Sequence, residues 1–301
     1  MSLTSRIANR SDPVSRFLTD LWPPKRRLPE EWMEALAQAN TLRPPEPVDW
    51  GRVGRAFDYR FRFMLAEMPS RSLVAWKGAI RAAFTFENPT LDFDAVEEVF
   101  TAIDDQIRQL APAGRNLDPT AERSLAATCI VLGLFEEVYR GGPTKEAPIF
   151  QCGPQPTLAD LHELAKPAWL DDLVALANLA WRAWQGRGSW TYYLNPTFAG
   201  SHTIGGADAD LIAYSNGAGG AGTLLEIKTT TRSRLEPDWL RQLLGYLLLD
   251  WPDKYCIRHL GFYLARQGLL LSAPVSAFLP TPSNDLATWR DRFKSLLDGK
   301  A

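Results

Sequence analysis

The stretch GGADADLIAYSNGAGGAGTLLEIKTT, residues 205–230, holds the pattern that decides the fold. Two short apolar runs are separated by the glycine-rich segment SNGAGGAG, which predicts two strands joined by a turn. Asp208 and Asp210 stand before the first run, and Glu226 and Lys228 stand at the end of the second. Isolated charges are costly to remove from water, so charges at the ends of core-like strands indicate a partner such as a metal ion or a phosphate.

Alternation along a strand fixes which of these charges share a face. Glu226 and Lys228 project the same way, as do Asp208 and Asp210, and the apolar neighbours of Glu226 are expected on the opposite, buried side. The turn brings an aspartate beside Glu226. Two carboxylates held close repel each other, and a divalent cation relieves that repulsion. Oxygen ligands without histidine or cysteine favour Mg²⁺ or Mn²⁺ over zinc.

The same residues carry a resemblance to a known group of enzymes. Asp210 followed by Glu226-Ile227-Lys228 resembles the D…E-x-K signature of the PD-(D/E)XK nuclease superfamily. The next predicted helix adds Gln242 and Tyr246, which lie four residues apart on one helical face. This pair resembles the Q-x-x-x-Y pattern of the RecB-like branch, in which it helps to hold the site and the nucleic acid.

The resemblance covers roughly residues 189 to 275 and implies a chemistry for this region. It implies a restriction-endonuclease-like core that hydrolyses DNA phosphodiester bonds with Mg²⁺ or Mn²⁺. Asp210 and Glu226 would bind the metal, with the carbonyl of Ile227 as a further ligand. Lys228 would orient or help to deprotonate the attacking water and neutralise charge on the phosphate.

The chain also departs from the family pattern. Many RecB-like enzymes place a metal-binding histidine four residues after a glycine in an early helix, whereas here Gly54 is followed by Asp58, so the ligand is either replaced by a carboxylate or absent. Several relatives bind an iron–sulfur cluster, but the three cysteines of this chain are far apart and form no C-x-x-C pair. Asp210 is preferred as the ligand because the superfamily's aspartate usually sits directly before the apolar residues, as Asp210 does in DLIAY, and Asp208 is held in reserve.

Periodicity along the chain predicts a change of architecture near residue 186. Helices are expected over residues 11–22, 29–40, 50–68, 91–111, 119–140 and 167–185. A proline-rich segment, LRPPEPVD, interrupts them because proline cannot continue a helix. Strands are expected over residues 189–198, 208–215, 222–230, 257–266 and 268–275, with helices over residues 236–250 and 286–297.

This order predicts an α/β fold. A mixed β-sheet flanked by helices would span residues 186–301, preceded by a mainly helical region, residues 1–185, that could contribute a core helix around residues 50–67. Because the formal net charge is only −2, any contact with nucleic acid needs a local basic surface. Arg232 and Arg234, directly after the lysine strand, are candidates for gripping phosphate; a solvated loop is the alternative.

Three further arginines stand among aromatic residues in the segment GRAFDYRFRF. Arg55, Arg60 and Arg62 could contact nucleic acid, or the pattern could be an ordinary helix with an aromatic core face. The sequence contains no apolar leader and no apolar run near the roughly 20 residues that span a bilayer, so we expect a cytoplasmic protein without membrane contact.

Two functions follow from these patterns. The first is a magnesium-dependent deoxyribonuclease, in a setting such as DNA repair or antiphage defence. The second is a non-catalytic nucleic-acid-binding or assembly subunit that retains the nuclease fold. In either case the helical region is a candidate surface for a protein partner such as a helicase or ATPase.

Overall fold

The computed structural model divides the chain into two compact units. It describes residues 1–66, 68–84, 91–110, 117–142, 144, 146–187, 190–215, 220–280 and 286–299. Residues 216–219 of the expected glycine-rich turn, and residue 67 at the end of the expected core helix, lie outside this set. The sheet unit consists of residues 1–41 and 186–301, and the helical unit consists of residues 42–185. The expected boundary near residue 186 is present, but residues 1–41 differ from the expectation because they pack with the sheet.

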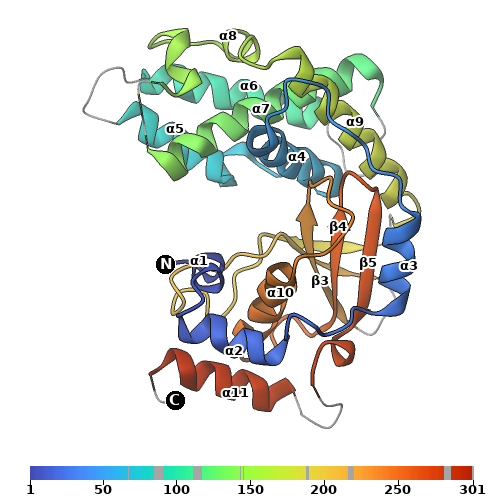
Figure 1. Ribbon diagram of the computed structural model, residues 1–301. Coiled ribbons are helices and arrows are strands. Elements are labelled where there is room, and N and C mark those ends of the chain that lie inside the picture. The colour runs from blue at the N-terminus through green and yellow to red at the C-terminus, as the bar shows by residue number, and fades with distance from the viewer. Residues whose placement is uncertain are drawn as a thin grey trace. The chain divides into compact units, whose positions relative to one another are not determined.

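The sheet unit is built on a five-stranded mixed sheet in the order β1-β2-β3-β4-β5 (Figure 1). The strands are β1 Thr191–Leu194, β2 Leu211–Tyr214, β3 Gly222–Lys228, β4 Ile257–Leu264 and β5 Leu269–Pro274. β1, β2 and β3 form an antiparallel meander, β4 runs parallel to β3, and β5 returns antiparallel to β4. Parallel neighbours need a crossover connection, and helix α10, Pro237–Leu249, supplies it. The predicted α/β class, with a mixed sheet and flanking helices, is confirmed.

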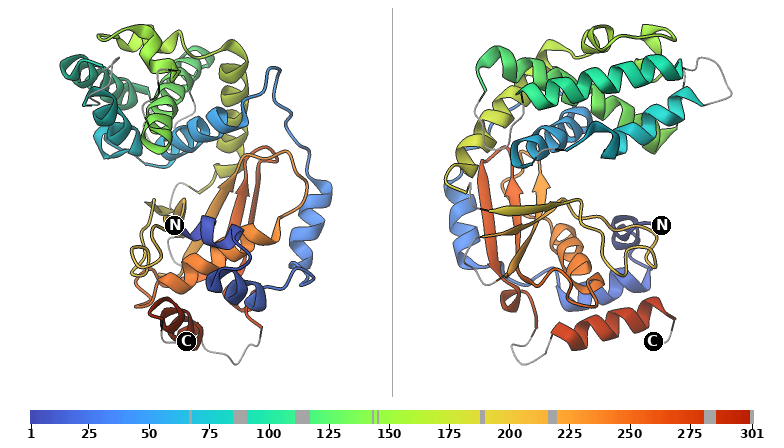
Figure 2. Two further views of the ribbon diagram at one scale, coloured as in Figure 1. Left: turned by 60° about the vertical axis from the view of Figure 1, so that its left-hand side comes forward. Right: turned by 180° about the vertical axis from the view of Figure 1, so that it is seen from behind.

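Helices from both ends of the chain complete the sheet unit. They are α1 Leu3–Ala8, α2 Pro13–Leu21, α3 Glu30–Gln38 and α11 Leu286–Leu297. Leu18 of α2 and Trp32 of α3 share one hydrophobic core with Leu224 of β3 and Phe262 of β4. Figure 2 shows α10 against the sheet with α1 and α2 beside it, and all three helices contact one another directly. This burial explains why residues 1–41 belong with the sheet.

Helix α1 was not predicted because it is short and its packing depends on a distant glycine. Ser2 caps it by accepting a hydrogen bond from the backbone N–H of Ser5, and Leu3 is buried at its first position. A Cβ added to Gly245 of α10 would stand 2.8 Å from Leu3 Cδ2. The missing side chain of Gly245 therefore lets α1 lie directly on α10.

The helical unit surrounds α7, a long and largely buried helix. Its elements are α4 Trp50–Leu65, η1 Ser70–Ser72, α5 Val74–Ala83, α6 Phe93–Leu110, α7 Pro119–Gly141, η2 Pro148–Cys152, α8 Leu158–His162 and α9 Pro167–Trp184. Helix α5 was not predicted, and it packs closely on α7. A Cβ added to Gly78 would stand 1.8 Å from the carbonyl oxygen of Phe135, so only glycine fits this contact. The expected helix around residues 50–67 is α4, and it belongs to the helical unit.

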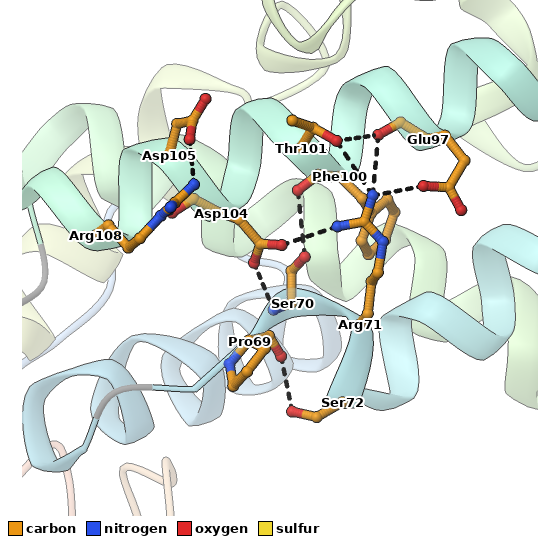
Figure 3. A network of polar contacts seen from close by, with 10 residues as sticks. All are labelled: Pro69, Ser70, Arg71, Ser72, Glu97, Phe100, Thr101, Asp104, Asp105 and Arg108. Carbon is orange, nitrogen blue, oxygen red and sulfur yellow. Dashed lines mark hydrogen bonds and ion pairs between the residues drawn. The ribbon is translucent and has the colours of Figure 1, made fainter.

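Ion pairs tie the helices of this unit together. Arg60 of α4 and Glu122 of α7 form a buried bidentate pair, with N–O distances of 2.6 and 2.7 Å. In Figure 3 Arg71 of η1 reaches α6 between Glu97 and Asp104, and Asp104 also accepts a hydrogen bond from the backbone N–H of Ser70 at 2.7 Å. These charged side chains therefore hold the helices of the helical unit together. Among the described residues no helix combines the length and apolar character needed to cross a membrane.

Candidate functional site

The β2–β3 hairpin positions the two carboxylates. Its register pairs Leu211 with Leu225, and one step further along the strands Asp210 stands opposite Glu226. Residues directly opposite in an antiparallel pair share a face, so the two acidic side chains are neighbours. Asp210 Oδ2 accepts a hydrogen bond of 2.6 Å from the backbone N–H of Ile227, which fixes its carboxylate against β3.

Helix α10 extends this pair into a continuous polar chain. Lys228 Nζ lies 2.9 Å from Glu226 Oε2 and donates to Gln242 Oε1 at 3.2 Å. Gln242 Nε2 in turn donates to the Tyr246 hydroxyl at 2.8 Å. Two strands and one helix thus bring Asp210, Glu226, Lys228, Gln242 and Tyr246 together, as the sequence patterns predict. The contacts also show that Glu226 and Lys228 project toward α10.

The face of β3 that carries these charges is itself a core face. Leu224, which shares it, is fully buried, and Leu225 on the opposite face is fully buried as well. Ile227 is only half-buried. The expectation that the apolar neighbours of Glu226 mark a single buried side is therefore incomplete, because the sheet is covered on both faces at β3. Burial makes the charge pairing around Glu226 energetically important.

The charge state of Lys228 follows from two opposing effects. Burial of the ammonium group lowers the pKa of Lys228, but the neighbouring carboxylates of Glu226 and Asp210 outweigh it, so the pKa is raised above the ordinary value. Lys228 is therefore an ammonium ion at neutral pH, which can donate hydrogen bonds and neutralise charge but cannot accept a proton from water. Burial also raises the pKa of Tyr246, with Glu226 adding to the effect, so its hydroxyl stays protonated.

One oxygen of the site has an unmet requirement. Glu226 is 3% exposed, and its Oε1 atom is buried without a hydrogen-bond partner among the described residues. A buried acceptor without a partner is destabilising, and a divalent cation would satisfy it. Mg²⁺ commonly uses one or two carboxylates together with waters and substrate phosphates. Asp210 and Glu226 fit that donor set.

The structure gives the other two acidic candidates different partners. Asp208 is exposed and forms an isolated bridge with Thr197. Asp58 belongs to the helical unit, where Arg62 Nε donates to Asp58 Oδ1 at 3.1 Å. Over the described ranges of the chain, no three histidine, cysteine, aspartate or glutamate side chains gather as a metal-binding group. The roles of Asp58 and of the Ile227 carbonyl as ligands stay predictions.

Arg232 and Arg234 lie in the exposed segment between β3 and α10. Both pair with Glu236, at 2.9 Å from Arg232 and 3.4 Å from Arg234. Exposed ion pairs of this kind contribute little to stability, so either guanidinium group can exchange its partner for a phosphate.

The arginines of α4 are engaged within the helical unit. Arg55 pairs with Glu137 at 3.2 Å, and Arg60 is sealed in its buried pair with Glu122. Arg62 is also buried. The aromatic residues of the segment GRAFDYRFRF fit the second interpretation, an ordinary helix with an aromatic core face, because Phe57, Phe61 and Phe63 are core residues.

Aromatic residues around the site were not predicted. Phe198, in the segment after β1, stacks on Tyr246 with a centroid distance of 5.6 Å and an interplanar angle of 22°. The ring centroid of Trp239 lies 5.7 Å from Lys228 Nζ. These residues lie in segments that look like ordinary core sequence, and only the tertiary structure places them at the polar chain.

No protein-family model, curated protein or solved structure matches this chain.

Proposed function

We propose that the sheet unit is a metal-dependent nuclease of the PD-(D/E)XK type, RecB-like branch, that hydrolyses DNA phosphodiester bonds. One observation carries the proposal: Glu226 is buried opposite Asp210, with one oxygen hydrogen-bonded to Lys228 and the other without a partner in the part of the chain that the structure describes. A carboxylate in this state is suited to a hard divalent ion. A closed structural ion pair does not explain why the second oxygen is buried and unsatisfied.

Each residue of the polar chain has a role in this proposal. Asp210 and Glu226 would hold Mg²⁺ or Mn²⁺, which when bound polarises a phosphate oxygen and activates water. The Lys228 ammonium group neutralises charge on the phosphate and orients water by donating to it. Gln242 and Tyr246 hold Lys228 in place through consecutive hydrogen bonds. Hydrolysis forms a new bond from water oxygen to phosphorus and breaks the bond to a sugar oxygen.

The order of elements supports the same assignment. The aspartate precedes β2, the E-x-K triplet ends β3, and the Q-x-x-x-Y pair lies on the crossover helix α10 that leads to the parallel strand β4. This is the order that the sequence resemblance implies for a restriction-endonuclease-like core. We propose further that the protein acts in DNA repair or antiphage defence together with a helicase or ATPase partner.

Cleavage assays on linear and circular DNA test the proposal. We expect the protein to cut in Mg²⁺ or Mn²⁺ and to be inactive in EDTA. Loss of one group that stabilises the transition state lowers the rate of catalysis on the order of 100-fold or more. We therefore expect Glu226→Gln and Lys228→Met to cut DNA at least about 100-fold more slowly than the parent. Asp291→Asn is the matched control, because this exposed carboxylate lies on α11, which contributes no residue to the polar chain. Equal cutting by Glu226→Gln and the parent would remove the nuclease assignment.

The ion pair between Glu226 and Lys228 favours a second candidate. Because Lys228 already neutralises the carboxylate at 2.9 Å, the site could be a structural remnant in a non-catalytic DNA-binding subunit. DNA binding that survives EDTA, together with no cleavage in any divalent metal, would select this function over the first.

A further inference from the structure

An exposed tyrosine stands on the edge strand of the sheet. Tyr193 of β1 is 57% exposed, although it is a large aromatic residue in a strand. Its ring makes T-shaped contacts with Tyr214 at 6.0 Å and with Tyr255 at 5.8 Å between centroids. Two such contacts hold the ring in one orientation while leaving much of its surface open.

The sheet register places this ring on the face that carries the carboxylates. Tyr193 pairs with Ile212, and Ile212 pairs with Leu224, so these three side chains form one row across the sheet. The row of Asp210 and Glu226 is two residues further along the strands. From strand spacing and rise, the backbone positions of Tyr193 and Glu226 are roughly 12 Å apart. That is a span of a few nucleotides along a single strand.

A cation accompanies the aromatic group. Lys254 Nζ lies 4.7 Å from the ring centroid of Tyr255 and 3.2 Å from its hydroxyl oxygen. Lys254 is exposed and has no carboxylate partner within the part of the chain that the structure describes. Its positive charge is therefore open to a phosphate group, next to the ring that supports Tyr193.

We propose that Tyr193 is a stacking platform for an unpaired base, with Lys254 contacting the backbone phosphate, and that the substrate reaches the carboxylates as single-stranded DNA. This inference deepens the proposed nuclease function and rests on it. An open aromatic face combined with positive charge is how proteins bind single strands without reading sequence. A base inside a duplex is stacked on both faces and cannot use the ring.

Binding measured in EDTA tests the platform separately from hydrolysis. Three fluorescein-labelled probes are compared by anisotropy: an oligothymidylate, an abasic strand of equal length, and a duplex. One base stacked on an aromatic ring corresponds to about a tenfold change in affinity, so Tyr193→Ala should bind oligothymidylate about tenfold more weakly. Tyr193→Phe should bind like the parent, because it keeps the ring. The abasic strand should show no difference among these variants, and the duplex should bind more weakly than oligothymidylate.

A matched control is Phe84→Ala, which removes an aromatic residue of similar exposure, 59%, from the helical unit. It should bind every probe like the parent. Parent-like binding of oligothymidylate by Tyr193→Ala, equal losses on the abasic strand, or preferred binding of the duplex would each overturn the platform. If the protein cuts DNA but shows any of these results, the platform is refuted and the nuclease function stands. If the probes bind as expected but no DNA is cut, the platform stands and the hydrolytic function is refuted.

Discussion

Replacing Lys228 by methionine isolates the charge that balances the buried carboxylate. Lys228→Met keeps an unbranched chain beside Trp239 but removes the ammonium group that lies 2.9 Å from Glu226. Breaking a buried ion pair by removing one partner costs about 3–5 kcal/mol, because the other charge stays buried without compensation. The Lys228 side chain is 18% exposed, so water partly screens the pair and we expect about 3 kcal/mol. For a unit of this size the loss lowers the midpoint of thermal unfolding by about 6–12 °C.

The assay is a double-mutant cycle followed by urea and thermal unfolding. Glu226→Gln combined with Lys228→Met leaves no uncompensated charge in the pair, so the double variant should be more stable than Lys228→Met alone. Mg²⁺ should stabilise Lys228→Met more than the double variant, since only the former keeps both carboxylates. Lys254→Met is the matched control: this exposed lysine also lies over an aromatic ring, and its loss should change stability by less than about 0.5 kcal/mol.

The dependence on pH provides a further check of the same pair. The pKa of Lys228 is raised in the folded state, so its contribution is complete below the ordinary lysine value of 10.5 and is lost as the pH rises through the folded value. The stability difference between the parent and Lys228→Met should therefore persist at neutral pH and shrink in strong alkali. If Lys228→Met were as stable as the parent at neutral pH, and the double variant no better, the reasoning about Glu226 would be refuted.

Three other variants test the packing. Arg60→Met should destabilise the helical unit by about 3–5 kcal/mol in urea unfolding, and adding Glu122→Leu should restore much of the loss; an unaffected single variant would contradict the buried pair. Gly78→Ala should lower the free energy of unfolding by about 1–3 kcal/mol, seen as a lower thermal midpoint, because the added Cβ meets the Phe135 carbonyl. Burial raises the pKa of Tyr214 from 10.0 to about 12, and Tyr193 adds to the effect. The protonated hydroxyl therefore contributes fully to stability below pH 10, and this contribution is lost as the pH rises toward 12. Tyr214→Phe should weaken that alkaline loss, which spectrophotometric titration with unfolding measures.

Local patterns predicted the sheet strands well because each has a short apolar run bounded by turn residues. The positions of Asp210 and Glu226 followed from strand alternation and the hairpin, and those of Gln242 and Tyr246 from helical spacing. These relations extend over a few residues, so sequence alone can specify them.

Long-range packing was beyond the same reasoning. The attachment of α1 depends on Gly245, about which the spacing near Leu3 says nothing. Likewise, whether Arg60 faces nucleic acid or a buried Glu122 depends on how α4 meets α7. The proline-rich segment at residues 42–49 does coincide with the start of the helical unit, so it was a usable boundary signal that the expected division left unused.

The sheet unit is formed by two segments that are far apart in the sequence, and this has a consequence for biosynthesis. Leu18 and Trp32 leave the ribosome well before α10 and β4, which supply their partners in the core. The helical unit is continuous in sequence and can fold during that interval. Until translation reaches the final strands, the nascent polypeptide carries an apolar arm without its binding surface, and this is the stage at which a chaperone is most needed.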